Sequence, residues 1–131
     1  MYSQGVTGPN YLHSAQVADA NGRVNFMTGF PGCYSGRWPH THFEIFASLD
    51  NATNGHDAGR ISQLAPPKAA CSEACALYPN STSNLNRITL KSDNVLGDGG
   101  VHRIAMTSGN FTDGHTAFPE ACLAVEQRRP T

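Results

Sequence analysis

Residues 30–43 of this chain read FPGCYSGRWPHTHF, and this stretch decides the fold and the chemistry expected of the whole sequence. It sets Tyr34, Arg37 and the pair His40 and His42 within nine residues. The residues around the two histidines alternate as in a β-strand, so both imidazoles share one face, about 6–7 Å apart along the strand. A phenolate with two imidazoles is an oxygen and nitrogen ligand set that suits a hard, oxidised metal, above all ferric iron.

Length and composition set the limits outside this stretch. The chain has 131 residues and a net charge of −1, and we expect a single domain over residues 1–131. It has no basic block or acidic tail, which argues against nucleic acid or an anionic membrane as a partner. No apolar run approaches the ~20 residues of a membrane-spanning helix. The chain as given shows no signal sequence, and a cytoplasmic and a secreted location both stay open.

Four cysteines, Cys33, Cys71, Cys75 and Cys122, allow three disulfide pairings, and the sequence does not choose among them. Cys71 and Cys75 stand at the i, i+4 spacing of a helix, which a zinc site can use. No second Cys or His pair with finger-like spacing follows. We therefore expect buried thiols that act as small apolar residues.

Turn signals divide the rest of the chain into short segments. Asn21-Gly22 is a strong cue for a hairpin turn. One helix is expected at 68–77, directly after Pro66-Pro67. Loops are expected at 48–59 and 79–87, and strands at 23–28, 41–47, 60–64, 101–107 and 115–125. This pattern predicts an all-β protein, an antiparallel β-sandwich with one short helix and long loops.

The motif residues resemble a known family. Residues 19–28 (DANGRVNFMT), 31–34 (PGCY) and 36–43 (GRWPHTHF) closely resemble the intradiol ring-cleaving dioxygenases, non-haem ferric enzymes that open catechols between the two hydroxyl groups. Outer matches extend the resemblance over most of residues 1–125. They are Met1-Tyr2-Ser3 and residues 11–17, 61–64 and 92–99.

The resemblance implies a ferric iron held by four side chains. By matching position, the ligands are Tyr2, Tyr34, His40 and His42. Tyr34 and His42 correspond to the axial pair of the family, and Tyr2 and His40 to the equatorial pair. The implied substrate is a small aromatic 1,2-diol, which O2 cleaves to a dicarboxylate of the cis,cis-muconate type. Catechol, protocatechuate, hydroxyquinol and larger phenols all remain candidates.

Three side chains take catalytic roles under the same resemblance. Tyr34 leaves the metal when the diol binds and takes up a substrate proton. Arg37 matches the active-site arginine, whose guanidinium stabilises charge that develops on the ring. Gln63 matches a glutamine that lies behind the ligands.

Members of this family have a strand before the first ligand tyrosine, which here is residue 2. We therefore expect that an upstream strand is missing from this chain, and that an edge of the sheet is left to be covered. An upstream segment, a partner chain or a homo-oligomer contact would cover it. Tyr11 is the reserve candidate for the first phenolate.

Two alternatives stand beside this interpretation. The first is a cupin-like Fe(II) or Mn(II) enzyme that uses His40, His42 and Glu44, since all three share one strand face. Cupins typically place the acid farther along the chain, and this alternative leaves Tyr34 and Arg37 unexplained. The second is a non-catalytic binding module, a truncated relative or pseudoenzyme that holds no stable iron.

Overall fold

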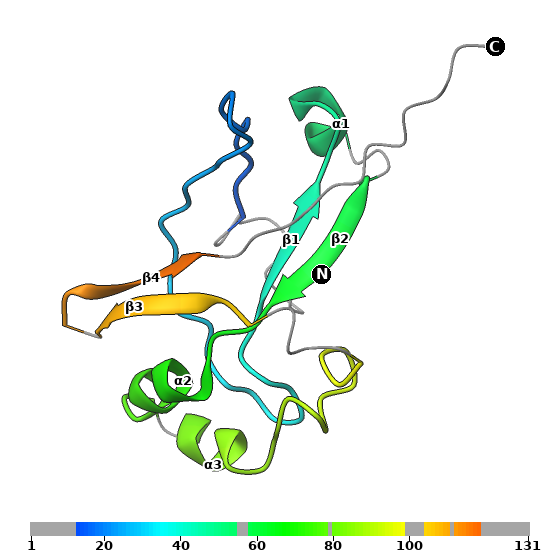
Figure 1. The fold of residues 1–131 in the computed structure, drawn as a ribbon. Helices are drawn as coiled ribbons and strands as arrows, with labels where there is room; N and C mark the ends of the chain where they lie inside the picture. Colours follow the sequence, from blue (N-terminus) through cyan, green and yellow to red (C-terminus); the bar gives the residue numbers. More distant parts are fainter. Residues whose placement is uncertain (1–12, 55–57, 79, 99–103, 111, 119–131) are drawn as a thin grey trace. The chain divides into compact units, whose positions relative to one another are not determined.

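The structure is a computed structural model that describes residues 13–54, 58–78, 80–98, 104–110 and 112–118. The elements in these ranges are β1 (Thr41–Ile45), α1 (Leu49–Thr53), β2 (Arg60–Leu64), α2 (Lys68–Cys75), α3 (Ser81–Leu85), β3 (Met106–Asn110) and β4 (Gly114–Phe118) (Figure 1). The chain divides into two compact units, Met1–Phe30 with Ile45–Gly59 and Pro31–Glu44 with Arg60–Thr131. Tyr2, Tyr11 and Cys122 lie outside the described residues. The single domain over residues 1–131 stays a prediction.

The predicted all-β sandwich is wrong for the part of the chain that the structure describes. The strands form two separate antiparallel pairs, β1 with β2 and β3 with β4, and helices contribute nearly as much structure as strands. Each strand has five residues, and a two-stranded sheet is too small to bury a sandwich core by itself. The expected strand at 23–28 does not form, and Val24, Phe26 and Met27 are exposed there.

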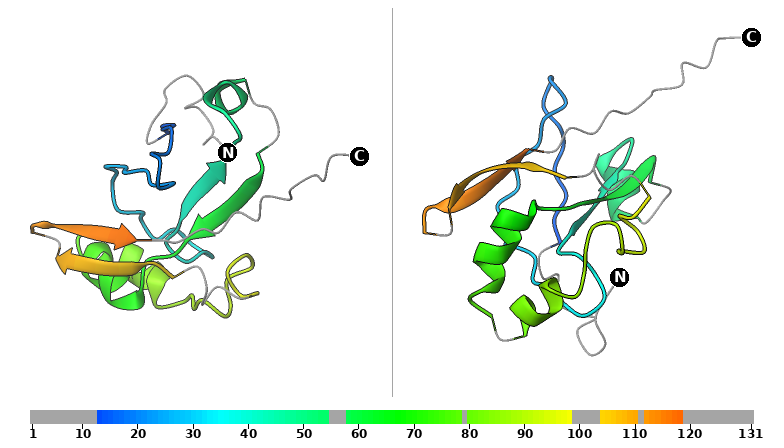
Figure 2. Two further views of the ribbon diagram at one scale, coloured as in Figure 1. Left: turned by 45° about the horizontal axis from the view of Figure 1, so that its top comes forward. Right: turned by 60° about the horizontal axis from the view of Figure 1, so that its bottom comes forward.

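The unit that carries the histidine motif has a core built from a loop and helices. Its most buried side chains include Cys33 and Trp38 of the loop, Leu85 of α3 and Leu96. Helix α2 starts directly after Pro67, as predicted, and ends at Cys75. Figure 2 shows α2 and α3 next to each other, close to the β3–β4 hairpin. The core therefore lies against α2 and α3.

The described cysteines are free, buried thiols. Cys33, Cys71 and Cys75 form no disulfide. Burial raises the pKa of Cys33 to about 11 and that of Cys71 to about 12. Both stay protonated at neutral pH, which confirms that they pack as small, nearly apolar groups.

Strands β3 and β4 form an antiparallel hairpin. Met106 pairs with Phe118 at one end and Asn110 with Gly114 at the other. The Asn110 Oδ1 atom accepts the N–H groups of Thr112 and Asp113 at 2.8 and 2.9 Å. Of the strand expected at 101–107, residues 101–103 lie outside the described residues, and β3 begins at Met106.

One short bridge joins the start of the hairpin to the end of β2. Ala65 and Ile104 form an isolated parallel bridge, and the N–H of Ala105 donates to the carbonyl of Ala65 at 2.9 Å. Ala65 and Ala105 are both buried. The end of β2 is therefore fixed to the core of this unit.

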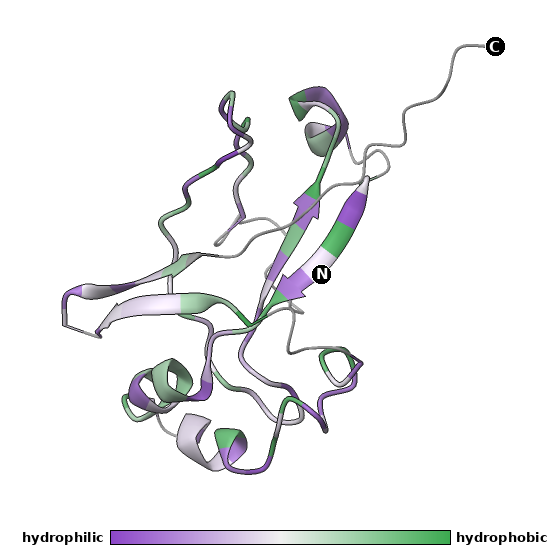
Figure 3. Cartoon of the chain, viewed as in Figure 1, coloured by the Kyte–Doolittle hydropathy of each residue, from purple (hydrophilic) through white to green (hydrophobic). Residues whose placement is uncertain are grey.

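Strands β1 and β2 form as predicted, and Figure 3 shows hydrophilic and hydrophobic residues following one another along both. The alternation matters because it places His42 and Glu44 on one face of β1. In β2, Gln63 is the buried residue. These two strands therefore bring a histidine and a buried amide to one sheet.

In the other unit, the predicted turn at Asp19–Gly22 is present. The N–H of Gly22 donates to the carbonyl of Asp19 at 2.9 Å, with Gly22 at φ +75°. Helix α1 lies in the segment expected as a loop, and Ser48 caps it by accepting the N–H of Asn51. Across the described ranges, no helix is long and apolar enough to cross a membrane.

Candidate metal centre

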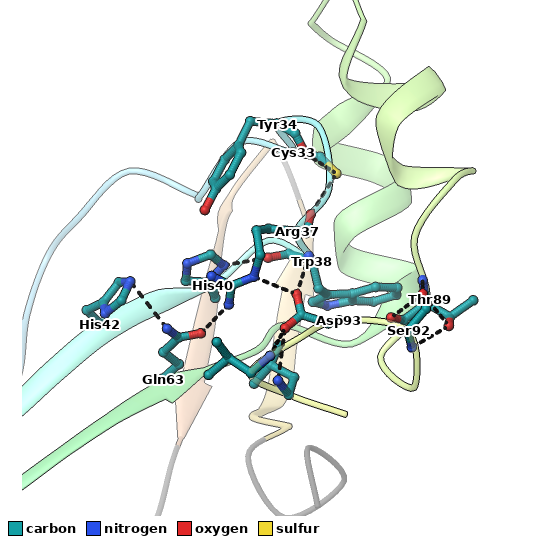
Figure 4. Close-up of polar contacts among 12 residues, drawn as sticks. Cys33, Tyr34, Arg37, Trp38, His40, His42, Gln63, Thr89, Ser92 and Asp93 are labelled. Atoms are coloured by element: carbon teal, nitrogen blue, oxygen red, sulfur yellow. Dashed lines mark hydrogen bonds and ion pairs between the residues drawn. The ribbon is translucent and has the colours of Figure 1, made fainter. Parts of the chain in front are cut away.

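Three of the four predicted ligands lie together. The ring centroids of Tyr34 and His40 are 6.0 Å apart, and those of His40 and His42 are 5.1 Å apart. Figure 4 shows the Tyr34 hydroxyl pointing toward the side on which the imidazoles lie. Tyr34 is 56% exposed. The loop before β1 and the first residues of β1 thus place a phenol and two imidazoles at one accessible spot.

The orientation of His40 is fixed by a backbone carbonyl. Its Nδ1 atom lies 2.5 Å from the carbonyl oxygen of Trp38. A carbonyl only accepts, so Nδ1 carries a proton, and in the neutral imidazole the lone pair is therefore on Nε2. Trp38 is itself buried, and its indole N–H donates to the carbonyl of Pro66 at 3.0 Å. This is the arrangement that orients a metal-binding histidine.

His42 is oriented by Gln63. The Nε2 atoms of the two side chains are 3.4 Å apart, and the Oε1 atom of Gln63 accepts from Arg37 at 2.6 Å. Since the amide oxygen faces Arg37, the amide NH2 faces His42 and donates to its Nε2 lone pair. Burial lowers the pKa of His42 below 6.5, and the charges of His40 and Arg37 lower it further. His42 is therefore neutral at pH 7, the form that binds metal.

Arg37 joins this sheet to a buried carboxylate. Its Nε atom donates to Oδ2 of Asp93 at 2.9 Å, while Nη2 donates to Gln63. The side chain of Arg37 is 16% exposed and that of Asp93 is completely buried. The planar guanidinium is thus held at two edges by different partners.

Asp93 is saturated with hydrogen bonds. Besides Arg37, its two oxygens accept the backbone N–H groups of Trp38, Val95 and Leu96 at 2.8, 2.9 and 2.9 Å. Burial alone would raise the pKa of the Asp93 carboxyl. The hydrogen bonds from Arg37 and from the backbone hold that pKa well below its usual range. Asp93 is therefore a carboxylate throughout the physiological range.

A surface hollow of about 380 Å³ adjoins this cluster. Its lining residues are His42, Arg60, Ile61, Ser62, Gln63 and Val95. Ile61 is 63% and Val95 36% exposed, so apolar side chains lie beside polar groups of the cluster. The hollow is open to solvent, and its lining is more polar than apolar.

The residues present fit ferric iron. His40 offers its Nε2 atom and Tyr34 a phenol oxygen, and the Nε2 lone pair of His42 would become available once it exchanges its contact with the Gln63 amide for the metal. These are donors that an oxidised iron prefers. Among the described residues, no three His, Cys, Asp or Glu side chains converge as a metal site would require. His40, His42 and Glu44 therefore do not form the cupin-like site.

The structure adds two residues that the sequence interpretation had not placed at the site, Asp93 and Trp38. Residues 92–99 entered only as an outer match to the family, and Trp38 only as part of the motif. The pair Asp93-Asn94 is a turn signal, and such a turn accounts for the carboxylate accepting the N–H groups of Val95 and Leu96. Nothing local indicates that this carboxylate also reaches Arg37, 56 residues away.

No protein-family model, no curated protein and no solved structure matches this chain. The resemblance to intradiol dioxygenases therefore depends on the motif residues and stays a prediction. The part of the predicted site that lies in the described residues is Tyr34, Arg37, His40, His42 and Gln63. A function for this protein is therefore argued from the contacts among these five side chains.

Proposed function

We propose that this protein is a non-haem Fe(III) dioxygenase of the intradiol type, which cleaves a small aromatic 1,2-diol with O2 to a dicarboxylate. The observation that carries the proposal is the cluster of Tyr34, His40 and His42, with Arg37 held beside it by Gln63. A histidine pair alone is common in proteins. A phenol, two oriented imidazoles and a fixed guanidinium in one place are much more specific.

Bound iron would act as a Lewis acid that binds the diol oxygens and prepares the ring for O2. His40 would hold the metal through Nε2, since its Nδ1 atom donates to the Trp38 carbonyl. His42 would hold it through Nε2 in exchange for the contact with the Gln63 amide. Tyr34 is 56% exposed, so its phenol oxygen would be accessible to a diol and would take up a diol proton.

Arg37 contributes charge. Two of its nitrogens are engaged by Asp93 and Gln63, and 16% of the side chain remains exposed. A guanidinium that is already fixed stabilises negative charge on the ring without reorganising during the reaction.

The hollow beside His42 supplies a place for the ring. Ile61 and Val95 offer apolar contact, and Arg60 adds a positive charge that favours the deprotonated diol. A ring in this hollow would lie next to His42 and Gln63, both of which line it. The substrate class is therefore a small phenolic dianion.

The experiment compares Tyr34→Phe with Tyr78→Phe after loading with Fe(III). Tyr34 and Tyr78 are 56% and 57% exposed, so the two variants lose the same group from equally accessible positions. We expect a visible phenolate-to-iron charge-transfer band, O2 uptake and a dicarboxylate product from catechol in the wild type and in Tyr78→Phe. Tyr34→Phe should shift or weaken the band. A colourless wild type that forms no product, or identical spectra for both variants, would contradict the proposal.

A non-catalytic binding module is the second candidate. The observation in its favour is the pair of two-stranded sheets where a larger sandwich was expected. Such a module would bind catechol in the hollow without O2 uptake. Titration calorimetry combined with an oxygen electrode separates the two candidates.

A further inference from the structure

We propose that Asp93 is the positioning residue of this site: it fixes the plane of Arg37 and, through Gln63, the orientation of His42. The catalytic part of this inference rests on the proposed function. The structural part, a relay from Asp93 to His42, stands on contacts within one compact unit. Figure 4 shows the relay as a continuous series of dashed contacts.

The relay begins at a carboxylate that has little freedom to move. Oδ1 of Asp93 accepts from Val95 and Leu96, and Oδ2 accepts from Trp38 and Arg37. Its side chain is completely buried. Because four donors surround the two oxygens, the carboxylate plane is fixed by its own turn and by the loop that precedes β1.

That fixed carboxylate determines the position of the guanidinium. Nε of Arg37 donates to Asp93 and Nη2 donates to Gln63. Two contacts at different nitrogens define the plane of the group, which one contact would leave free to rotate. A lysine has a single charged nitrogen and cannot occupy both positions with the same geometry.

The guanidinium in turn determines which way the Gln63 amide faces. The Oε1 atom must face the Arg37 donor, so the NH2 group is left to face His42. The buried carboxylate therefore orders the imidazole of His42 through Arg37 and Gln63.

Asp93→Asn is the informative change. Asparagine has nearly the same shape as aspartate, but its NH2 group replaces one carboxylate oxygen and therefore faces N–H donors where an acceptor is needed. Asp19→Asn is the matched control, because the Asp19 carboxylate accepts the N–H groups of Asn21 and Arg23 in an exposed turn and lies in the other compact unit. Both variants remove one carboxylate that accepts from the backbone.

The first measurement needs no activity. In the full chain without added metal, proton exchange at the Arg37 Nε–H is followed by NMR. We expect this proton to exchange at least ~10-fold faster in Asp93→Asn, because a hydrogen bond to a charged acceptor is lost. Asp19→Asn should match the wild type. Equal protection of the Arg37 proton in Asp93→Asn and in the wild type would overturn the proposal.

The second measurement uses the iron-loaded protein. Asp93→Asn should keep the iron while kcat for catechol falls ~10²-fold, the scale of one lost preorganised group. Because Asp93 acts through Arg37, the double variant Asp93→Asn/Arg37→Leu should be no slower than Arg37→Leu. Losses that multiply would mean that Asp93 acts independently, which overturns the positioning role. A wild type that cleaves no diol refutes the proposed function, and the NMR result still decides the relay.

If Asp93→Asn does not fold, Arg37→Lys tests the same relay from its centre. This variant keeps a cation beside Asp93 and all the backbone contacts of the carboxylate. We expect the Gln63 side-chain NH2 protons to exchange faster and kcat to fall toward that of Arg37→Leu. Unchanged Gln63 protons would show that Arg37 does not orient the amide.

Discussion

The Arg37 guanidinium and the Asp93 carboxylate form an ion pair of 2.9 Å between segments 56 residues apart in the sequence. A buried ion pair gains little stability overall, because desolvation of both groups offsets their attraction. Removing one partner is costly, because the other charge stays buried alone. This pair is therefore better explained as a device that sets geometry than as a source of stability.

The first prediction concerns stability. Asp93→Ala should lower the free energy of unfolding by about 3–5 kcal/mol, the range for breaking a buried pair. Asp19→Ala should cost about 1 kcal/mol, because its exposed carboxylate only accepts nearby N–H groups. Urea unfolding followed by circular dichroism measures both. Equal losses of unfolding free energy in the two variants would show that burial of Asp93 adds nothing to the cost of removing its carboxylate.

The second prediction is the pH dependence of that stability. The pKa of Asp93 is held below its usual range in the folded state. A carboxyl group with a depressed folded pKa stabilises the protein above its unfolded pKa of about 3.9, and this contribution is lost as the pH falls further. The difference in unfolding free energy between the wild type and Asp93→Asn should therefore shrink as the pH falls below about 4. A difference that stays constant from pH 6 to the acid limit of folding would contradict the assignment.

The sequence predicted the elements near the site because their signals are local. Alternation predicted β1 and β2, and the two prolines before Lys68 predicted the start of α2. The clustering of Tyr34 with His40 follows from their nearness in the chain. These features need little information from distant residues.

Other features depend on contacts that no local pattern contains. Helix α3 reads STSNL, a weak helix former, and it is stabilised by burial of Ser81 and Leu85. The Ser48 cap of α1 was visible, but the polar composition of 48–59 favoured a loop. The prediction of a β-sandwich was wrong because alternation at 23–28 indicates a strand but does not provide a neighbouring strand for it to pair with. Asp93 was missed as a site residue for the same reason, since its role depends on a long-range contact.

The third prediction is that His40 is needed for iron. Its Nε2 lone pair is kept free by the bond from Nδ1 to the Trp38 carbonyl. His40→Ala should lower iron affinity by more than the ~10–100-fold typical of losing an outer hydrogen-bond partner. His13→Ala removes an exposed imidazole in the other compact unit and should keep full iron content. Metal analysis after dialysis against a weak chelator gives the ratio of iron to protein, and equal ratios for both variants would exclude His40 as a ligand.

The fourth prediction identifies the second phenolate. The resemblance names Tyr2, with Tyr11 in reserve, and both lie outside the described residues. Two phenolates give more charge-transfer absorbance per iron than one. In Tyr34→Phe, the residual visible band should come from the Tyr2 phenolate. The double variant Tyr2→Phe/Tyr34→Phe should therefore lose the band, while His40 and His42 still hold some iron.

The measurement for this prediction is absorbance normalised to bound iron, taken for Tyr2→Phe, Tyr11→Phe and each of these combined with Tyr34→Phe. Normalisation separates loss of a chromophore from loss of metal, because a phenylalanine at a ligand position lowers both. If Tyr11→Phe removes the residual band and Tyr2→Phe does not, Tyr11 is the second phenolate. If the residual band survives both changes, the residual phenolate is neither of these tyrosines, and the ligand set carried over from the family is wrong at that position.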